Sequence, residues 1–183
     1  MNDTKWSQDL YQQTYEFAAA AHNDQKVPGS DLPYITHVTL VSMELLAAAT
    51  ECDDVDFAMQ CSLLHDVLED TSVAYDDVVS RFGRAIAEAV SSLTKDRTLP
   101  KHDQIAESLT RVKAQPRDVW RVKLADRITN LRRPPTTWQD DKKARYRQDA
   151  ILICDVLGPA SDILSKRLRT KIEEYAGYIE SEL

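Results

Sequence analysis

The segment His65-Asp66-Val67-Leu68-Glu69-Asp70 carries one imidazole and three carboxylates in close succession. Positions 65 and 69, 66 and 70, and 66 and 69 are three or four residues apart, so on a continuous helix these four polar side chains share one side. Such a group repels itself unless protons or a cation compensate the charge. A divalent metal would do so, with a histidine nitrogen and an aspartate oxygen as ligands. Taken alone, the segment is also typical of a solvated acidic helix end with one core histidine.

Two further segments offer partners for such a metal. His37 ends the run PYITH at the beginning of an expected helix, and Asp126 and Asn130 are four residues apart in VKLADRITN, with Lys123 three residues before Asp126. Because the neighbouring residues are apolar, a buried aspartate at position 126 is costly unless it is paired or metal-bound. Each residue alone could make a structural polar contact. Together, three helices supply two histidines and two aspartates, enough for a metal that keeps open positions for water.

The order His37, His65-Asp66, Asp126 resembles that of the HD-domain phosphohydrolases. The runs PYITH, LLHDVLEDT and VKLADRITNLR are similar to the (p)ppGpp hydrolase domain of the RelA/SpoT family. Because the sequence shows no synthetase domain, it resembles the small alarmone hydrolases within that family. The resemblance extends from AAAAHNDQKVPG through LTKDRTLPK to the run WQDDKKARY. The pairing of LLHDVLEDT with VKLADRxxN is specific, whereas an HD dipeptide alone is not.

The resemblance implies a role for each matching position. It implies one Mn²⁺ per chain, held by His37, His65, Asp66 and Asp126. Glu69 and Asp70 match the pair that orients or activates the attacking water. The substrate contacts that it implies are Lys26, Tyr34, Asn130, Lys142 and Tyr146. Two features depart from the family pattern: Val38 stands where most members have proline, and the loop QKVPGSDLPY is longer than in the bifunctional enzymes.

The substrate that the resemblance implies carries a strongly anionic 3′-pyrophosphate. A metal lowers the pKa of bound water from 15.7 toward about 7, and Glu69 or Asp70 could accept the proton of that water. Cationic side chains would hold the phosphates. The candidates are Lys26, Lys123, Arg127, Lys142, Lys143 and Arg145. An ordinary ion pair is an equal alternative for Arg127, a solvated helix face is an alternative for Lys143 and Arg145, and we expect His22 at the surface or in a cap and Trp138 in the core.

Hydrophobic periodicity predicts an all-α fold. Only four glycines occur, and Val and Ile lie mostly at helical spacing. A cap at Asp53 or Asp54 begins a helix that continues through His65 and Leu68, and Gly83 ends a short helix over 75–82. The other expected helices cover about 4–23, 35–49, a segment ending at Leu93, a segment through Ile105, Leu109 and Val112, 116–132, 137–157 and 160–182. We expect one compact HD-type bundle of about eight to ten helices over residues 1–183.

The composition limits the class of protein. With 43% hydrophobic and 29% charged residues, the 183-residue chain suits one globular domain. A net charge of −7 argues against indiscriminate binding of nucleic acid, and no uncharged stretch reaches the roughly 20 apolar residues of a membrane span. The first ten residues lack a signal-peptide pattern. Three widely spaced cysteines are expected to be unpaired, which predicts a cytoplasmic location.

The resemblance implies a manganese-dependent hydrolase that acts on a small nucleotide, (p)ppGpp, and not on nucleic acid or a membrane. It would convert ppGpp to GDP and pppGpp to GTP with release of pyrophosphate. An HD-family phosphatase acting on NADPH or another phosphorylated nucleotide is one alternative, because it would share the metal centre. A helical regulator that binds a nucleotide without hydrolysing it is another, but the intact ligand set and the Glu69–Asp70 pair argue against it.

Overall fold

The structure is a computed structural model, and it describes residues 6–180. Within this range the chain forms ten α-helices and two short 3₁₀ helices, and its only β-type pairing is an isolated antiparallel bridge between Lys26 and Pro33. The all-α prediction is confirmed. The α-helices are α1 (Gln8–Ala21), α2 (Ile35–Ala47), α3 (Val55–Leu64), α4 (Val67–Asp70), α5 (Tyr75–Phe82), α6 (Arg84–Leu93), α7 (Gln104–Lys113), α8 (Arg117–Asn130), α9 (Asp140–Leu157) and α10 (Asp162–Glu180).

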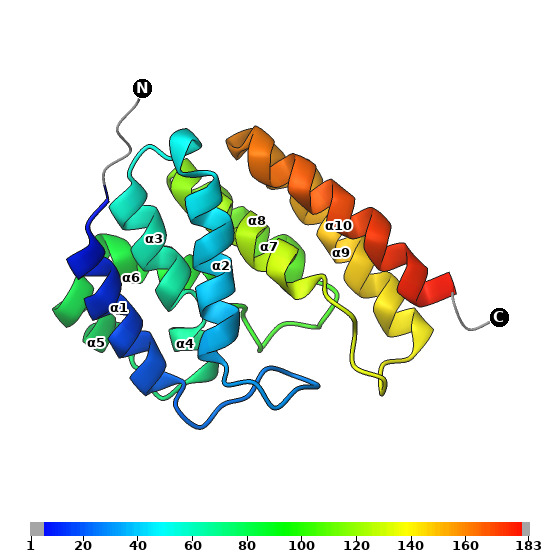
Figure 1. Cartoon of the computed structure of the whole chain (residues 1–183), viewed down its shortest axis with the longest axis horizontal. Helices are drawn as coiled ribbons and strands as arrows, with labels where there is room; N and C mark the ends of the chain where they lie inside the picture. The colour runs from blue at the N-terminus through cyan, green and yellow to red at the C-terminus, as the bar shows by residue number, and fades with distance from the viewer. Residues whose placement is uncertain (1–5, 181–183) are drawn as a thin grey trace.

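Helix α8 lies between two groups of helices (Figure 1). Helices α2 and α3 pack against it from one group, and the adjacent pair α9 and α10 packs against it from the other. The buried apolar side chains form one connected core. Almost every position of α8 between Asp118 and Thr129 is buried, so its charged residues need partners inside the protein. These charged residues are Asp118, Arg121, Lys123, Asp126 and Arg127.

Local sequence signals set several helix ends. Asp54 caps α3, and its side chain accepts a hydrogen bond from the Phe57 N–H at 3.0 Å. Gly83 separates α5 from α6 with a φ of +88°, a conformation that other residues rarely adopt. Other boundaries differ from the expected ones by a few residues: α8 ends at Asn130 rather than near 132, and α9 begins at Asp140 rather than near 137. The expected ends at residues 4 and 182 lie outside the described range.

The third helix is not continuous, so that part of the sequence prediction is wrong. Helix α3 ends at Leu64 and the four-residue α4 begins at Val67, which leaves His65 and Asp66 between them. The backbone at Asp66 has φ −105° and ψ −3°, away from the α-helical values near −63° and −42°. The chain therefore turns at this point, and His65 and Glu69 do not share one helix face.

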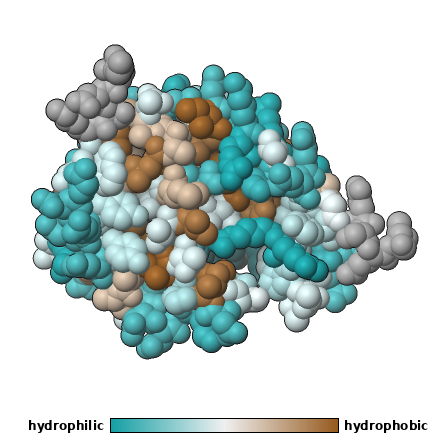
Figure 2. Space-filling model, viewed as in Figure 1, coloured by the Kyte–Doolittle hydropathy of each residue, from teal (hydrophilic) through white to brown (hydrophobic). Residues whose placement is uncertain are grey.

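The visible face in Figure 2 carries hydrophobic residues in separate patches among hydrophilic ones. Exposed large apolar side chains in the described range include Leu32, Met43, Leu152, Ile163 and Tyr178. None of the described helices has both the length and the apolar character that crossing a bilayer requires. The three cysteines are free thiols, as the sequence predicts.

Candidate metal centre and active site

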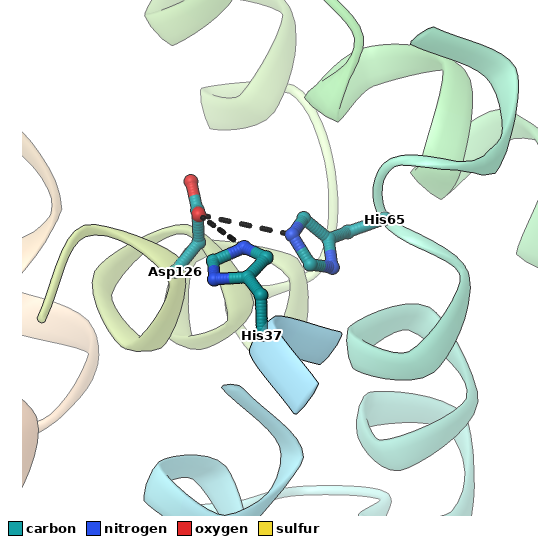
Figure 3. Close-up of side chains that lie close together, drawn as sticks. All are labelled: His37, His65 and Asp126. Carbon is teal, nitrogen blue, oxygen red and sulfur yellow. Dashed lines mark ion pairs between the residues drawn. The ribbon is translucent and has the colours of Figure 1, made fainter. Parts of the chain in front are cut away.

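Three buried side chains from different parts of the chain point toward one another (Figure 3). His37 lies near the beginning of α2, His65 directly follows α3, and Asp126 belongs to α8. The Asp126 Oδ1 atom lies 3.5 Å from His37 Nε2 and 3.7 Å from His65 Nε2. One ligand atom of each residue lies within 4.8 Å of the others. Two imidazole nitrogens and a carboxylate oxygen at this spacing can bind one metal ion.

Asp66 lies beside both of these imidazoles. Its Oδ2 atom lies 2.9 Å from His65 Nε2 and 3.6 Å from His37 Nε2, and it accepts a hydrogen bond from the Tyr34 hydroxyl at 2.6 Å. On a continuous helix, consecutive side chains point about 100° apart. The break between α3 and α4 instead directs His65 and Asp66 to one place. The structure thus places Asp66 beside both imidazoles, next to the mutually close set formed by His37, His65 and Asp126.

The backbone fixes the tautomer of His65. Its Nδ1 donates to the Ser62 carbonyl at 2.7 Å, because a carbonyl oxygen can only accept. Its Nε2 is buried and has no hydrogen-bond partner among the described residues, since the nearby Asp66 oxygen lacks hydrogen-bond geometry. A histidine that ligates a metal typically donates its other ring N–H in this way. The open Nε2 atom of His65 therefore fits a metal ion.

The charges in this group depend on one another. Burial alone would raise the pKa of Asp66 and of Asp126, but His65 beside Asp66 and Lys123 beside Asp126 outweigh it and hold both pKa values well below their usual range. Burial alone would lower the pKa of His65, but the same two carboxylates raise it to about 10. The imidazoles and the carboxylates therefore favour each other's charged forms. A divalent cation supplies such positive charge and takes the place of protons on the imidazoles.

Two more side chains of α8 hold the Asp126 carboxylate. The Asn130 amide nitrogen donates to its Oδ1 atom, and Lys123 Nζ lies 3.4 Å from its Oδ2 atom. Lys123 is 5% exposed, and burial lowers its pKa. Its ammonium group faces Asp126, so the positive charge of Lys123 can influence a bound metal or substrate through that carboxylate. Asn130 also lines an adjoining cavity.

Glu69 and Asp70 on α4 face two cations that sequence reasoning missed. Glu69 accepts hydrogen bonds from the Lys95 N–H at 3.0 Å and from Lys95 Nζ at 3.2 Å. Arg97 Nη2 lies 2.6 Å from Asp70 Oδ1 and 3.5 Å from Glu69 Oε1. Burial, together with the nearby Asp66 and Glu69 carboxylates, raises the pKa of Asp70. Lys95 and Arg97 lie in the run LTKDRT, which contributes to the family resemblance. That run does not by itself show which residues its two cations contact.

A cavity of about 220 Å³ opens beside the metal centre, and Tyr34, His37 and Asn130 form part of its wall. The rest comes from two loops that follow α1 and α8: Val27, Pro28, Ser30, Leu32, Arg132, Pro135 and Trp138. The loops meet at Gly29, where a Cβ atom would lie 3.2 Å from Pro135 Cγ. Lys26, a predicted substrate contact, does not line this cavity. Its Nζ lies 2.7 Å from Asp31 Oδ1, on the exposed side of the loop.

The predicted pair Lys142 and Tyr146 belongs to a row of four side chains. Arg127 Cζ lies 4.5 Å from the centre of the Tyr146 ring, the Tyr146 and Trp138 rings are 5.1 Å apart edge to face, and Lys142 Nζ lies 3.8 Å from the Trp138 ring. Trp138 also lines the cavity, contrary to the expectation of a core position. Arg127 is buried, and its Nε and Nη1 atoms have no hydrogen-bond partner in the described range. The other candidate cations pair nearby, Lys143 with Asp140 and Arg145 with Asp141.

Comparison with known proteins identifies the family to which this geometry belongs. The family model described as an HD domain matches residues 14–153, a range that contains all four candidate ligands. The chain belongs to the HD domain family. An HD domain implies a divalent metal ion, and in this one His37, His65 and Asp126 form a buried set of donors that can hold it.

Several relatives of this HD domain carry descriptive names. The mouse protein named guanosine-3′,5′-bis(diphosphate) 3′-pyrophosphohydrolase MESH1 is 31% identical over 164 residues, which cover 87% of this chain and 90% of the mouse protein. The bifunctional (p)ppGpp synthase/hydrolase SpoT of Escherichia coli K12 is 32% identical over 168 residues, which cover 88% of this chain and 23% of SpoT. A solved structure, described as a metazoan ortholog of SpoT that hydrolyzes ppGpp and plays a role in starvation responses, matches with a TM-score of 0.82 and 26% identity. That match covers 95% of this chain and 99% of the other.

One further residue of this HD domain has the capping position that the sequence suggested, and it is also buried. His22, expected at the surface or in a cap, is the C-cap residue of α1 and is 2% exposed. Its ring lies 4.9 Å from that of Tyr34, and its Nδ1 atom lies 2.8 Å from Gln25 Oε1. The sequence signal for this position was its place in AAAAHNDQ, within the family resemblance.

Proposed function

We propose that the protein hydrolyses the 3′-pyrophosphate of ppGpp and pppGpp, giving GDP or GTP and pyrophosphate and so lowering the level of the stringent-response alarmone. The observation that carries this proposal is the convergence of two imidazoles and two carboxylates beside a cavity. The names of the mouse and bacterial relatives support the choice of substrate. The ligands that we propose are His37, His65, Asp66 and Asp126.

Mn²⁺, one ion per chain, is the metal that we propose for this centre. A site with two imidazole nitrogens, two carboxylate oxygens and open positions suits Mn²⁺ better than it suits structural zinc, which is bound in a closed site. When bound, such an ion lowers the pKa of water toward about 7 and so provides a nucleophile near neutral pH. The Tyr34 hydroxyl donates a hydrogen bond to one carboxylate oxygen of Asp66, and the Asn130 amide donates one to a carboxylate oxygen of Asp126. These hydrogen bonds fix the positions of the two proposed ligands.

Glu69 and Asp70 are the proposed catalytic pair. Asp70 has the raised pKa, which brings it nearer to the operating pH of a general base, so we assign the acceptance of the proton to its carboxylate. Glu69 receives hydrogen bonds from Lys95 and Arg97 and is held in place to orient the water. The water attacks the phosphorus that is bonded to the ribose 3′-oxygen. The bond between that phosphorus and the ribose oxygen breaks, and the leaving 3′-oxygen takes up a proton to become the ribose 3′-hydroxyl.

Substrate binding is divided between the cavity and the cations around it. We propose that Tyr34, Asn130 and Tyr146 contact the nucleoside, and that Trp138 provides an aromatic wall for the base. Two nitrogens of Arg127 have no hydrogen-bond partner among residues 6–180, and we propose that they bind a phosphate. Lys26 and Lys142 complete the proposed phosphate contacts. Lys123 influences the bound substrate through its charge, which faces the Asp126 carboxylate.

We further propose that residues 1–183 act as one HD-type domain in the cytoplasm. The end of α9 and the whole of α10 lie beyond the residues that the family model matches, and both helices pack on α8 and share its core. The free thiols of Cys52, Cys61 and Cys154 suit a reducing compartment.

A product assay tests the proposal. The Mn²⁺-loaded protein is incubated with ppGpp, NADPH and GMP in separate reactions, and the products are resolved by chromatography. We expect GDP and intact pyrophosphate from ppGpp, and in H₂¹⁸O the label enters the pyrophosphate rather than GDP. Orthophosphate from NADPH or GMP at a higher kcat/KM would instead support a nucleotide phosphatase. Tight binding of ppGpp without turnover would support a regulator.

A further inference from the structure

His22 and Gln25 form a hydrogen-bonded connection between the end of α1 and the end of α4. The His22 Nδ1 atom lies 2.8 Å from Gln25 Oε1, and the Gln25 side-chain nitrogen donates to the main-chain carbonyl of Asp70. His22 is 2% exposed and is the C-cap residue of α1. Neither residue belongs to the candidate ligands, the catalytic pair or the cavity wall.

The direction of each hydrogen bond follows from the chemistry of the groups. The Asp70 carbonyl only accepts, so the amide nitrogen of Gln25 faces it and the amide oxygen faces His22. That oxygen can also only accept, so His22 donates from Nδ1. Burial lowers the pKa of His22, which keeps the ring neutral near pH 7 with its hydrogen on this nitrogen.

The same histidine also supports the other end of α4. Its ring lies 4.9 Å from the ring of Tyr34, whose hydroxyl donates to Asp66 Oδ2 at 2.6 Å. Asp66 is the N-cap residue of α4 and Asp70 is its last residue. Both ends of this helix are therefore connected to His22, one through Tyr34 and the other through Gln25.

Helix α4 depends on such outside contacts. It has only four residues, and a single turn of helix has too few internal hydrogen bonds to be stable by itself. The main-chain N–H groups of Glu69 and Asp70 bond to the Asp66 carbonyl at 3.2 and 2.9 Å. Any movement of the Asp70 end therefore changes how the two carboxylates lie relative to Asp66.

We propose that His22 and Gln25 are positioning residues that hold α4, and with it Glu69 and Asp70, in a fixed place against Asp66. The inference rests on the proposed function, because the Glu69–Asp70 pair is assigned its catalytic role there. His22 and Gln25 touch no reacting atom in this scheme. They act through the main chain of Asp70 and the side chain of Tyr34.

Kinetics give the first test. His22→Phe keeps the ring beside Tyr34 but removes the donor, and Gln25→Ala removes the link to Asp70. We expect each to lower kcat for ppGpp about 10-fold, the lower end of what the loss of a residue supporting a metal site costs, with KM within about twofold of wild type. The double variant should be no worse than either single one, because both act through one connection. His22→Asn restores a donor near the Nδ1 position and should recover part of kcat.

Amide hydrogen exchange gives a second readout that needs neither substrate nor metal. In His22→Phe and Gln25→Ala, the amides of Glu69 and Asp70 should exchange about 10-fold faster, while the rest of the chain keeps its protection. The matched controls are His102→Phe, at a side chain that is 82% exposed, and Gln60→Ala, which removes a glutamine hydrogen bond to Thr14. Both controls should leave kcat and the α4 amides unchanged.

The outcomes separate this inference from the proposed function. Unchanged exchange at Glu69 and Asp70 in both variants would overturn the inference, whatever the activity. A lower kcat that accompanies a general loss of protection and of Tm would also overturn it, because it would show a role in overall stability. Faster local exchange in a protein that releases no pyrophosphate from ppGpp would leave the positioning of α4 standing and would refute the proposed function alone.

Discussion

The two ends of helix α8 bury charge in different ways. Toward its beginning, Asp118 accepts hydrogen bonds from the N–H groups of Asp53 and Asp54 at 3.2 and 2.9 Å and from Arg121 Nη1 at 2.5 Å. Arg121 also donates from Nε to the Ala160 carbonyl at 2.9 Å. The carboxylate and the guanidinium are both bound to protein groups. This cluster joins α8 to the segments before α3 and before α10.

Toward the end of the same helix, polar atoms remain open. Asp126 faces His65, whose Nε2 has no hydrogen-bond partner among the described residues, and two nitrogens of Arg127 also lack one. Buried polar atoms are nearly always satisfied, so unsatisfied ones in a native protein require an explanation. The comparison teaches that paired buried charges connect elements of this fold, whereas the open ones lie where we propose that a metal and a phosphate bind.

The largest effect should come from removing a proposed metal ligand at the end of α8 that carries Asp126. His65→Gln should weaken Mn²⁺ binding by more than about 100-fold, beyond the cost of losing a residue that only supports a ligand, and should abolish hydrolysis of ppGpp. The variant should also be less stable than the wild type when both are metal-free, because the buried Asp66 and Asp126 carboxylates lose a partner. Manganese-edge anomalous scattering and urea titration measure the two effects. A manganese peak at the unchanged position in the variant would contradict the prediction, and His102→Gln is the control.

Two buried arginines on α8 allow a direct test of the comparison. Arg121→Met should lower the free energy of unfolding by about 3–5 kcal/mol, because it leaves Asp118 buried without its countercharge. Arg127→Met should cost no more than about 1–2 kcal/mol, the contribution of its contact with the Tyr146 ring, but should raise KM for ppGpp. Urea unfolding and steady-state kinetics of both variants provide the measurement. Equal losses of stability would remove the distinction between the two ends.

Glu69→Gln and Asp70→Asn should keep the metal and lose turnover. Removing a positioned acid or base costs roughly 10²-fold or more in kcat. Manganese affinity should stay within a few-fold of wild type, because neither side chain is one of the proposed ligands. Single-turnover kinetics with ppGpp and a manganese titration check both statements. Near wild-type turnover in both variants would assign the pair a structural role through Lys95 and Arg97.

The smallest effect is expected at the cavity wall. Trp138→Leu should raise KM for ppGpp by the loss of about 1–3 kcal/mol of base stacking, with little change in kcat. The control is Trp120→Leu, at a tryptophan that packs against the core and donates to the Gln115 carbonyl. That variant should lower stability and leave KM unchanged. A KM that does not respond to Trp138→Leu would place the base elsewhere.

Local features of the sequence predicted much of the fold. The helical spacing of apolar residues gave the all-α class, and the cap at Asp54 and the stop at Gly83 depend only on neighbouring residues. The break after α3 was not predictable in this way. The apolar positions Cys61, Leu64 and Leu68 continue the helical pattern across it, and the turn at Asp66 is accompanied by tertiary contacts, above all the hydrogen bond from Tyr34.

The candidate site shows the same division. The residue types at 37, 65, 66 and 126 suggested a metal because imidazoles and carboxylates have few other uses inside a core. Lys95 and Arg97 were missed because they lie in a loop, where no periodicity shows which residue faces Glu69. The connection from His22 to α4 was missed for a related reason: the partners of His22 depend on how the loop after α1 folds back onto α4.

The separation of the candidate ligands along the chain has a consequence for synthesis. His37, His65 and Asp66 leave the ribosome early, but Asp126 belongs to α8, which is buried only after α9 and α10 pack on it. Domains fold as units as they emerge, and metal binds to a folded site. A nascent chain therefore offers no complete set of candidate ligands until α8 has been translated and has packed against α2 and α3. Metal binding is then expected to follow the folding of this part of the chain.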